Sequence, residues 1–379
     1  MNVNVNVNVN ANVEQWDLAR GGSPPAAPSE STPRVGKLER LPKWLNLVPI
    51  VAQWAWLSLR YRAITLPSCC NPAVTTGGMV GEGKLEYLDI MGSRALRVTA
   101  ATTSAVADGI ESLAEFESVM KRAGLSYPVV VKPNLGWCGF GVRRIDDRDA
   151  LMAYLAGFPR GERVVLQRWM QEAGEAGIFY MRRPGERRGR IVGMLLRHYP
   201  RVTGDGVRTV AQLMAADPRA SRLGGDGASE ACCDVTQVPA LGQVVRIAVV
   251  AATRVGGRYE DGSAMVTPAL RRAFDAICHD MKDFHVGRFD VKFESIVALR
   301  AGTGFTIIEV NGAGSEAVHA WDPSLTLRQA YRIIFDKQRR LFAIGDRMRR
   351  RGHRPVGWWA LARHHFRQQA LIKRYPPSN

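Results

Sequence analysis

The sequence predicts a mixed α and β protein of the α+β class. Short apolar runs with strand periodicity alternate with segments of helical periodicity between about residues 111 and 323. Chemically distinctive side chains also fall on predicted strands: a lysine follows the apolar run 129–131, and acids lie within 288–291 and 307–311. At 379 residues the chain can bury one large core or two to three smaller ones.

The first 110 residues are predicted to lie outside the main α+β region. Residues 1–36 combine Asn-Val pairs with a proline-rich stretch, which predicts a disordered, low-complexity tail. Residues 37–110 are predicted to form a mostly helical region. Its apolar segment 45–59 is shorter than a membrane-spanning helix and contains Pro49 and Gln53. We expect either a helix buried against the domain or an interfacial helix with tryptophans and basic residues near lipid headgroups.

The region 111–323 is predicted to be one domain that carries the chemistry. Its periodicity predicts helices over 111–123, 147–155, 209–216 and 270–281, and strands over 127–132, 141–145, 164–167, 177–181, 189–196, 287–293 and 304–310. Residues 324–379 are predicted to form a basic, helical C-terminal extension.

The net charge of +17 favours acidic partners such as nucleic acid, anionic lipid headgroups or polyanionic substrates. The C-terminal extension is therefore expected to be a solvated helical face or to contact an anionic membrane surface. Nucleic acid is not expected, because no nucleic-acid-binding module pattern is present. The six cysteines lack metal-binding spacing, and no secretory signal pattern is visible, so we expect reduced thiols in a cytoplasmic protein, or one peripheral at the membrane.

A lysine and a glycine-rich turn follow the apolar strand at 129–131. Lys132 ends this strand, and the glycines come directly after it, at Gly136, Gly139 and Gly141. Glycine lets backbone N–H groups approach a phosphate closely. The pattern predicts a phosphate-binding turn, with a plain loop as the alternative. The usual phosphate-loop motif does not occur in the chain.

Two acids and an amide lie on the two later strands: Asp290, Glu309 and Asn311. Glu309 and Asn311 share a strand face, because they are two residues apart. Carboxylate and amide oxygens suit Mg²⁺ or Mn²⁺, and magnesium sites in proteins commonly include phosphate oxygens. The alternative is a solvated face, or an ion pair of Asp290 with Arg288 or Lys292. Together with Lys132, these residues predict a site for ATP and its metal ions.

These motifs, taken in order, resemble the ATP-grasp enzymes over about residues 71–323. The resemblance is strongest to the D-alanine–D-alanine ligase branch and to uncharacterised carboxylate–amine ligase-like proteins. It implies two α/β subdomains that grip the nucleotide, here with an atypical N-terminal region. It also implies that Lys84 and Lys132 hold phosphates, and that residues 134–142 form the glycine-rich lid.

The resemblance assigns further roles along the chain. It implies that Gln167, Trp169 and Met170 lie at the adenine edge and that Glu175 holds the ribose hydroxyls. It implies catalytic roles for the two arginines, Arg197 at the phosphate and Arg288 at the oxyanion, and metal binding by Asp290, Glu309 and Asn311.

The function that the resemblance implies is ATP-dependent ligation. A carboxylate of a small molecule or peptide would be activated as an acyl phosphate and joined to an amine or a thiol. The segment 312–316 departs from the ligase branch, so D-alanine is not the expected substrate. The sequence leaves the oligomeric state open, and the resemblance adds the option of a homodimer, because relatives in that branch are often dimers. Two alternatives stay open: a nucleotide-binding interaction protein without ligation, and a basic peripheral membrane protein.

Overall fold

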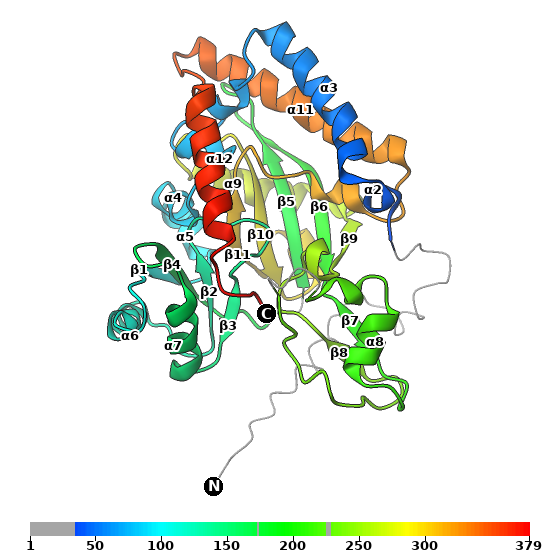
Figure 1. Ribbon diagram of the computed structural model, residues 1–379. Helices are drawn as coiled ribbons and strands as arrows, with labels where there is room; N and C mark the ends of the chain where they lie inside the picture. The colour runs from blue at the N-terminus through cyan, green and yellow to red at the C-terminus, as the bar shows by residue number, and fades with distance from the viewer. Residues whose placement is uncertain (1–34, 173, 225–228) are drawn as a thin grey trace.

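The computed structural model describes residues 35–172, 174–224 and 229–379. The predicted tail over 1–36 therefore lies almost entirely outside the described residues. The described chain is built around two antiparallel sheets, which confirms the predicted mixed α and β architecture (Figure 1).

The smaller of these two sheets carries Lys132. Its strands, in spatial order, are β1 (Thr102–Val106), β4 (Arg163–Arg168), β2 (Val129–Pro133) and β3 (Arg143–Ile145). Alternate residues of β2 and β4 pack against α6 (Leu113–Arg122) and α7 (Arg148–Gly157) in one apolar cluster. The predicted domain boundary at residue 110 would separate the edge strand β1 from the rest of its sheet. We therefore place the start of this domain before Thr102.

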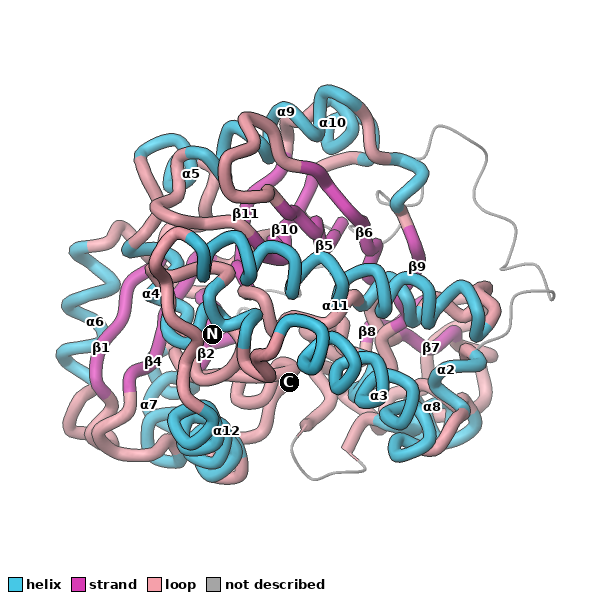
Figure 2. The backbone as a smooth tube through the Cα atoms, turned by 90° about the horizontal axis from the view of Figure 1, so that it is seen from above, coloured by secondary structure: helices cyan, strands magenta, loops and turns pink. Residues whose placement is uncertain are grey.

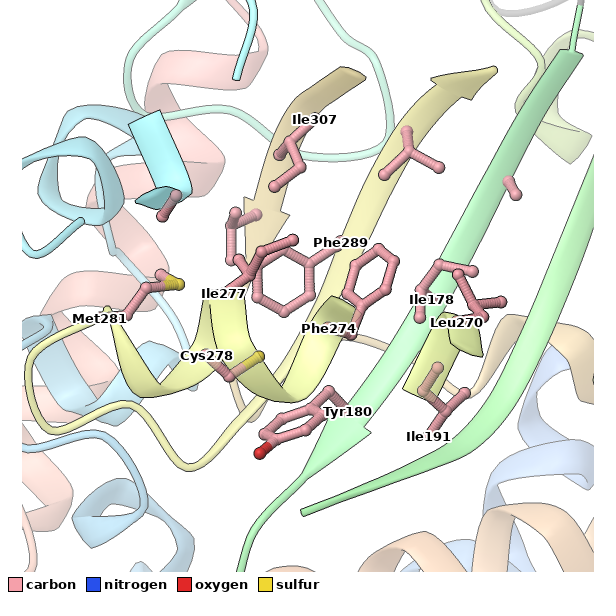
Figure 3. Packing of buried hydrophobic residues seen from close by; sticks show 14 of the residues in the cluster. Ile178, Tyr180, Ile191, Leu270, Phe274, Ile277, Cys278, Met281, Phe289 and Ile307 are labelled. Carbon is pink, nitrogen blue, oxygen red and sulfur yellow. The ribbon is translucent and has the colours of Figure 1, made fainter. Parts of the chain in front are cut away.

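The larger sheet carries the acids. Its strands, in order, are β11 (Phe305–Asn311), β10 (Val286–Phe293), β5 (Gly174–Met181), β6 (Arg190–His198) and β9 (Arg258–Asp261). Helices α9 (Pro268–His279) and α10 (Ile296–Ala301) cover one face. On that face Phe274 packs beside Phe289 (Figure 3), 5.5 Å away between ring centroids. The Phe305 ring centroid lies 5.1 Å from that of Phe274. This apolar face fixes which residues point to the opposite, polar face.

A third, small unit has its own apolar cluster. It contains β7 (Arg201–Thr203), β8 (Val244–Arg246) and α8 (Val210–Ala216), and the short helices η3 (Ala220–Arg222) and η4 (Thr253–Val255). The remaining short helices lie in the connections between the larger elements. They are α4 (Lys84–Asp89), α5 (Ser93–Arg97), η1 (Leu66–Cys69), η2 (Thr75–Gly78), η5 (Ser263–Met265) and η6 (Val318–Trp321).

The described chain begins and ends in helices, and helices from the two ends pack together. The N-terminal pair is α2 (Lys37–Arg40) and α3 (Lys43–Tyr61), and the C-terminal pair is α11 (Leu327–Arg350) and α12 (Trp358–Ile372). Helix α3 lies along α11 (Figure 2). The prediction that 45–59 is a buried helix is wrong, because Asn46 and Leu57 are its only buried residues. No helix in the described ranges combines the length and apolarity that crossing a bilayer requires.

The C-terminal extension also contacts the glycine-rich turn. Gln368 Nε2 donates to the carbonyl of Gly136 at 3.0 Å, and the Tyr375 hydroxyl donates to the carbonyl of Leu135 at 2.7 Å. The extension is therefore part of the folded structure around the predicted phosphate turn.

We expect Phe289→Ala to lower the free energy of unfolding by about 3 to 5 kcal/mol, because it leaves a cavity between Phe274 and Phe284. Urea unfolding measures this. The matched control is Phe366→Ala at an exposed position, which should cost far less. Equal losses in both variants would contradict the packing described for the larger sheet.

Candidate active site

The register of the larger sheet brings the predicted acids together. Asp290 pairs directly with Glu309 on β11 and with Gly177 on β5, and Arg288 pairs with Asn311. Residues directly opposite on antiparallel strands project to the same face. The structure therefore places Arg288, Asp290, Glu309 and Asn311 on one face, opposite the apolar face that packs against α9.

Asp290 is the centre of this polar face, and only 1% of it is exposed. Arg288 Nε donates to its Oδ1 at 2.8 Å, and Arg197 Nη2 donates to its Oδ2 at 3.1 Å. Asn311 Nδ2 donates to the same Oδ2 at 3.3 Å. A buried carboxylate needs such partners. The ion pair with Arg288 that the sequence left open thus exists, whereas Lys292 pairs elsewhere.

Arg197 connects Asp290 to a second buried acid. Its Nη1 donates to Glu175 Oε1 at 2.9 Å. The other carboxylate oxygen of Glu175 accepts from the Tyr199 hydroxyl and lies 3.6 Å from Lys292 Nζ. Burial opposes ionisation, but Lys292 and Arg197 lower the pKa of Glu175 to about 2. The predicted ribose acid is therefore already ion-paired within the protein.

The sequence reasoning did not find the roles of Lys292, Tyr199 and Gly177. Lys292 lies two residues after Asp290 on β10, so strand alternation gave a signal for its face. Gly177 lies beneath the arginine–aspartate pair. A Cβ there would approach Arg288 Cδ and Asp290 Oδ1 to 3.2 Å. Only a very small residue leaves room for that pair.

Lys132 joins the two sheets. It shares a face of the smaller sheet with Gln167 and Thr102, away from the apolar cluster. Its Nζ donates to Gln167 Oε1 and to the carbonyl of Ile308, both at 2.9 Å. Ile308 directly precedes Glu309. Burial lowers the pKa of Lys132 to about 8, although the charge of Glu309 acts in the opposite direction.

Lys84 and the glycine-rich turn complete the cluster. Lys84 is the first residue of α4, and its Nζ lies 3.4 Å from Glu309 Oε1. A Cβ on Gly136 would lie 2.6 Å from Lys84 Nζ, so the ammonium group lies directly against the turn. Gly139 and Gly141 complete the turn with positive φ. Lys84 thus contacts both Glu309 and the predicted phosphate turn, and Lys132 bonds to the backbone next to Glu309.

The predicted adenine-edge residues lie on β4 and directly after it. The Gln167 amide donates to Thr102 Oγ1 at 3.0 Å, so this side chain supports Lys132. Trp169 and Met170 lie after the end of β4, partly exposed, and the Arg144 guanidinium lies 4.9 Å from the Trp169 ring centroid. Their roles at the nucleotide base stay predictions.

A narrow hollow lies between the sheets beside these groups. Its lining is both polar and apolar and includes Lys84, Thr102, Lys132, Gln167, Glu309, Leu88, Met91, Val165 and Ile307. Apolar walls with a few converging polar groups are typical of small-molecule sites. A larger, open hollow lined by Arg182, His285 and Arg351 includes none of the predicted site residues.

The balance of charge favours an anionic ligand. Five basic side chains and three acidic ones form the linked cluster: Lys84, Lys132, Arg197, Arg288 and Lys292, with Glu175, Asp290 and Glu309. Within this set the basic side chains outnumber the acids, which favours the approach of an anion such as phosphate.

The oxygen donors also fit a magnesium ion. Asp290 and Glu309 supply carboxylates from paired strand positions, and Asn311 uses its amide nitrogen toward Asp290, which leaves its amide oxygen. Within the described ranges no group of three or more His, Cys, Asp and Glu side chains is arranged to hold a metal. The set therefore fits magnesium bound together with phosphate oxygens rather than by protein alone.

No protein-family model matches the sequence, and a search of curated proteins gives no significant match. Solved structures are similar at the level of fold. A bifunctional glutathione synthetase from Pasteurella multocida is 18% identical with a TM-score of 0.33. The match covers 69% of this chain and 38% of that one.

Two other solved structures give a comparable picture. The D-alanine–D-alanine ligase from Bacillus anthracis is 14% identical over 72% of this chain and 69% of its own, with a TM-score of 0.39. The carboxyaminoimidazole ribonucleotide synthase from Aspergillus clavatus, complexed with ATP, is 10% identical over 60% of this chain and 44% of its own, with a TM-score of 0.34. These proteins are ATP-grasp ligases, the group that the motifs resemble. Identities this low concern the fold, and any activity has to be argued from this chain's own residues.

We expect stability to depend on pH through Glu175. Its pKa is lowered from 4.5 to about 2 in the folded protein, so its ionisation stabilises the fold above pH 4.5. That stability is lost as the pH falls toward 2. Urea unfolding of the wild type should therefore lose more stability between pH 5 and pH 3 than unfolding of Glu175→Gln.

Glu115→Gln, at an exposed acid of α6, is the control and should keep the wild-type dependence on pH. If Glu175→Gln has the same dependence as the wild type, the ion pairs of Glu175 do not carry the proposed stability.

Proposed function

We propose that this protein is a magnesium- and ATP-dependent ligase that activates a carboxylate as an acyl phosphate and joins it to an amine or a thiol. One observation carries the proposal. Lys84 lies at Glu309 and against the glycine-rich turn, and Lys132 donates to the carbonyl of Ile308, the residue before Glu309. Glu309 in turn lies directly opposite Asp290 on the next strand.

The lysines would bind and orient the phosphates of the nucleotide. The Lys84 ammonium group lies 3.4 Å from Glu309, the Lys132 ammonium group donates to the carbonyl of the preceding Ile308, and Gly136 brings the backbone of the turn against Lys84. Backbone N–H groups and ammonium groups together are a common way to hold a triphosphate. The cost of holding these charges together in the free protein favours entry of an anion.

The arginines would act at the reacting carboxylate. Arg288 and Arg197 are fixed by Asp290, so their remaining N–H groups are oriented before a substrate binds. Such preorganised donors stabilise an oxyanion at little reorganisation cost. Asp290, Glu309 and Asn311 would hold magnesium, which when bound neutralises charge on the transferring phosphoryl group.

This chemistry needs no nucleophilic side chain from the protein. A carboxylate is a poor electrophile, and an acyl phosphate provides a good leaving group. The amine or thiol then displaces phosphate and forms the product bond. The test is phosphate release from magnesium-ATP in a screen of carboxylate and amine pairs. Release that requires both partners supports ligation, whereas nucleotide binding without such release supports a non-ligating binding protein.

We expect Glu309→Gln to lower turnover about a hundredfold or more, because it removes a magnesium-binding carboxylate. The fold should persist, because the Glu309 side chain is 30% exposed and its nearest ion pair is at 3.4 Å. Phosphate release and circular dichroism measure the two effects. Full turnover in this variant with magnesium present would contradict the assignment.

We expect Lys132→Met to weaken nucleotide binding about tenfold to a hundredfold, because it removes a charged donor to phosphate. Lys132 has a pKa of about 8 and is charged below it, so wild-type affinity should fall as the pH rises from 7 to 9. Isothermal titration at each pH measures both effects. The variant should show a smaller dependence on pH. Lys121→Met on the exposed side of α6 is the control, and unchanged affinity in Lys132→Met would remove the phosphate role.

A further inference from the structure

The outward face of α3 is an extended apolar surface. Its large exposed side chains are Trp44, Leu45, Leu47, Val48, Val51, Trp56 and Leu59, with Trp44 68% and Leu59 79% exposed. Trp44, Val48, Val51, Ala55 and Leu59 recur at helical spacing, so these five residues form one continuous stripe along the helix. Proteins that work free in water rarely expose so large a contiguous apolar patch.

The opposite face of α3 is fixed to the protein. Gln53 Nε2 donates to the carbonyl of Phe335 at 2.8 Å, and the Trp54 ring lies 4.9 Å from Phe342, measured between centroids. Gln338 Nε2 donates to the carbonyl of Ile50 at 3.2 Å. The helix is thus held on α11 with its apolar face turned outward, which a buried core helix would not do.

Charge at both ends of α3 indicates what covers this face. The helix contains no acidic residue. Exposed basic residues lie in its first and last turns and just beyond them: Lys37, Arg40, Lys43, Arg60 and Arg62. The Arg60 guanidinium lies 5.5 Å from the centroid of the Trp56 ring. Apolar and aromatic side chains between basic residues are typical of helices that lie in a bilayer interface.

Helix α12 adds exposed aromatic residues on the same side of the molecule as α3 (Figures 1 and 2). Trp358, Trp359 and Phe366 are exposed there, together with the basic residues Arg363 and Arg367. The aromatic and basic character of α3 is therefore repeated on a second helix.

We propose that the outward face of α3 binds the surface of an anionic lipid bilayer, with the helix lying in the headgroup region. A second copy of this chain is a poorer match, because two basic α3 ends would repel each other. Lipid chains would cover the apolar face, and anionic headgroups would pair with the basic ends. This surface is separate from the candidate active site, so its test does not depend on the proposed ligase activity.

The test is co-sedimentation of the full chain with vesicles made of equal parts phosphatidylglycerol and phosphatidylcholine. The wild type should bind these vesicles more tightly than vesicles of phosphatidylcholine alone, and salt should weaken binding. The double variant Val51→Glu/Leu59→Glu should lower the partition coefficient at least about tenfold. Two apolar contacts with the bilayer are lost, and two negative side chains face the negative headgroups.

The matched control is Leu241→Glu/Val297→Glu, which makes the same charge change at apolar residues that are 83% and 72% exposed elsewhere. It should bind like the wild type. Lys43→Gln/Arg60→Gln should lose preference for anionic vesicles by about fivefold per residue.

Three outcomes would overturn the proposal: no vesicle binding by the wild type, equal binding by the α3 variant, or equal losses in the control. Analytical ultracentrifugation without lipid tests the alternative that a second copy of this chain covers the outward face of α3. A wild-type dimer that the α3 variant converts to a monomer, with no vesicle binding, would assign this face to a second copy instead.

Discussion

The candidate site depends on one buried carboxylate, Asp290, and the two guanidinium groups that hold it. A charge that is 1% exposed is costly unless it is paired, and here Arg288 and Arg197 pair it from neighbouring positions of the sheet. Arg197 also holds Glu175, so one network ties together β5, β6 and β10. Asn311 also bonds to Asp290, and the strand register places Glu309 opposite it.

The network explains why the site suits phosphate chemistry. Its acids orient the arginines without neutralising the whole cluster, and the lysines add charge at the edge nearest the other sheet. The lowered pKa of Lys132 indicates that charging its amine is costly in the free protein. A bound phosphate would offset that cost, so anion binding and protonation are coupled. The glycine-rich turn lies against Lys84, and contacts from α12 and the chain end stabilise it.

Local sequence patterns predicted the parts of this arrangement that depend on neighbouring residues. Strand alternation placed Glu309 and Asn311 on one face, and the glycines after Lys132 marked the turn. The Asp290–Arg288 pair was among the sequence alternatives, because the two residues are close in the chain. The contact of Arg197 with Asp290 could not be predicted the same way, because Arg197 lies on β6, 93 residues before Asp290. The sequence left a buried and an interfacial α3 open for the same reason. Which side of an apolar helix is buried depends here on α11, almost three hundred residues later.

The most direct measurement is an experimental structure of the protein with magnesium and a non-hydrolysable ATP analogue. We expect the triphosphate to lie between the glycine-rich turn and the paired strands β10 and β11, within reach of Lys84 and Lys132, with a magnesium ion bound by Asp290 and Glu309. A triphosphate bound elsewhere, or one that leaves the Lys84–Glu309 ion pair and the hydrogen bonds of Lys132 unchanged, would contradict the account.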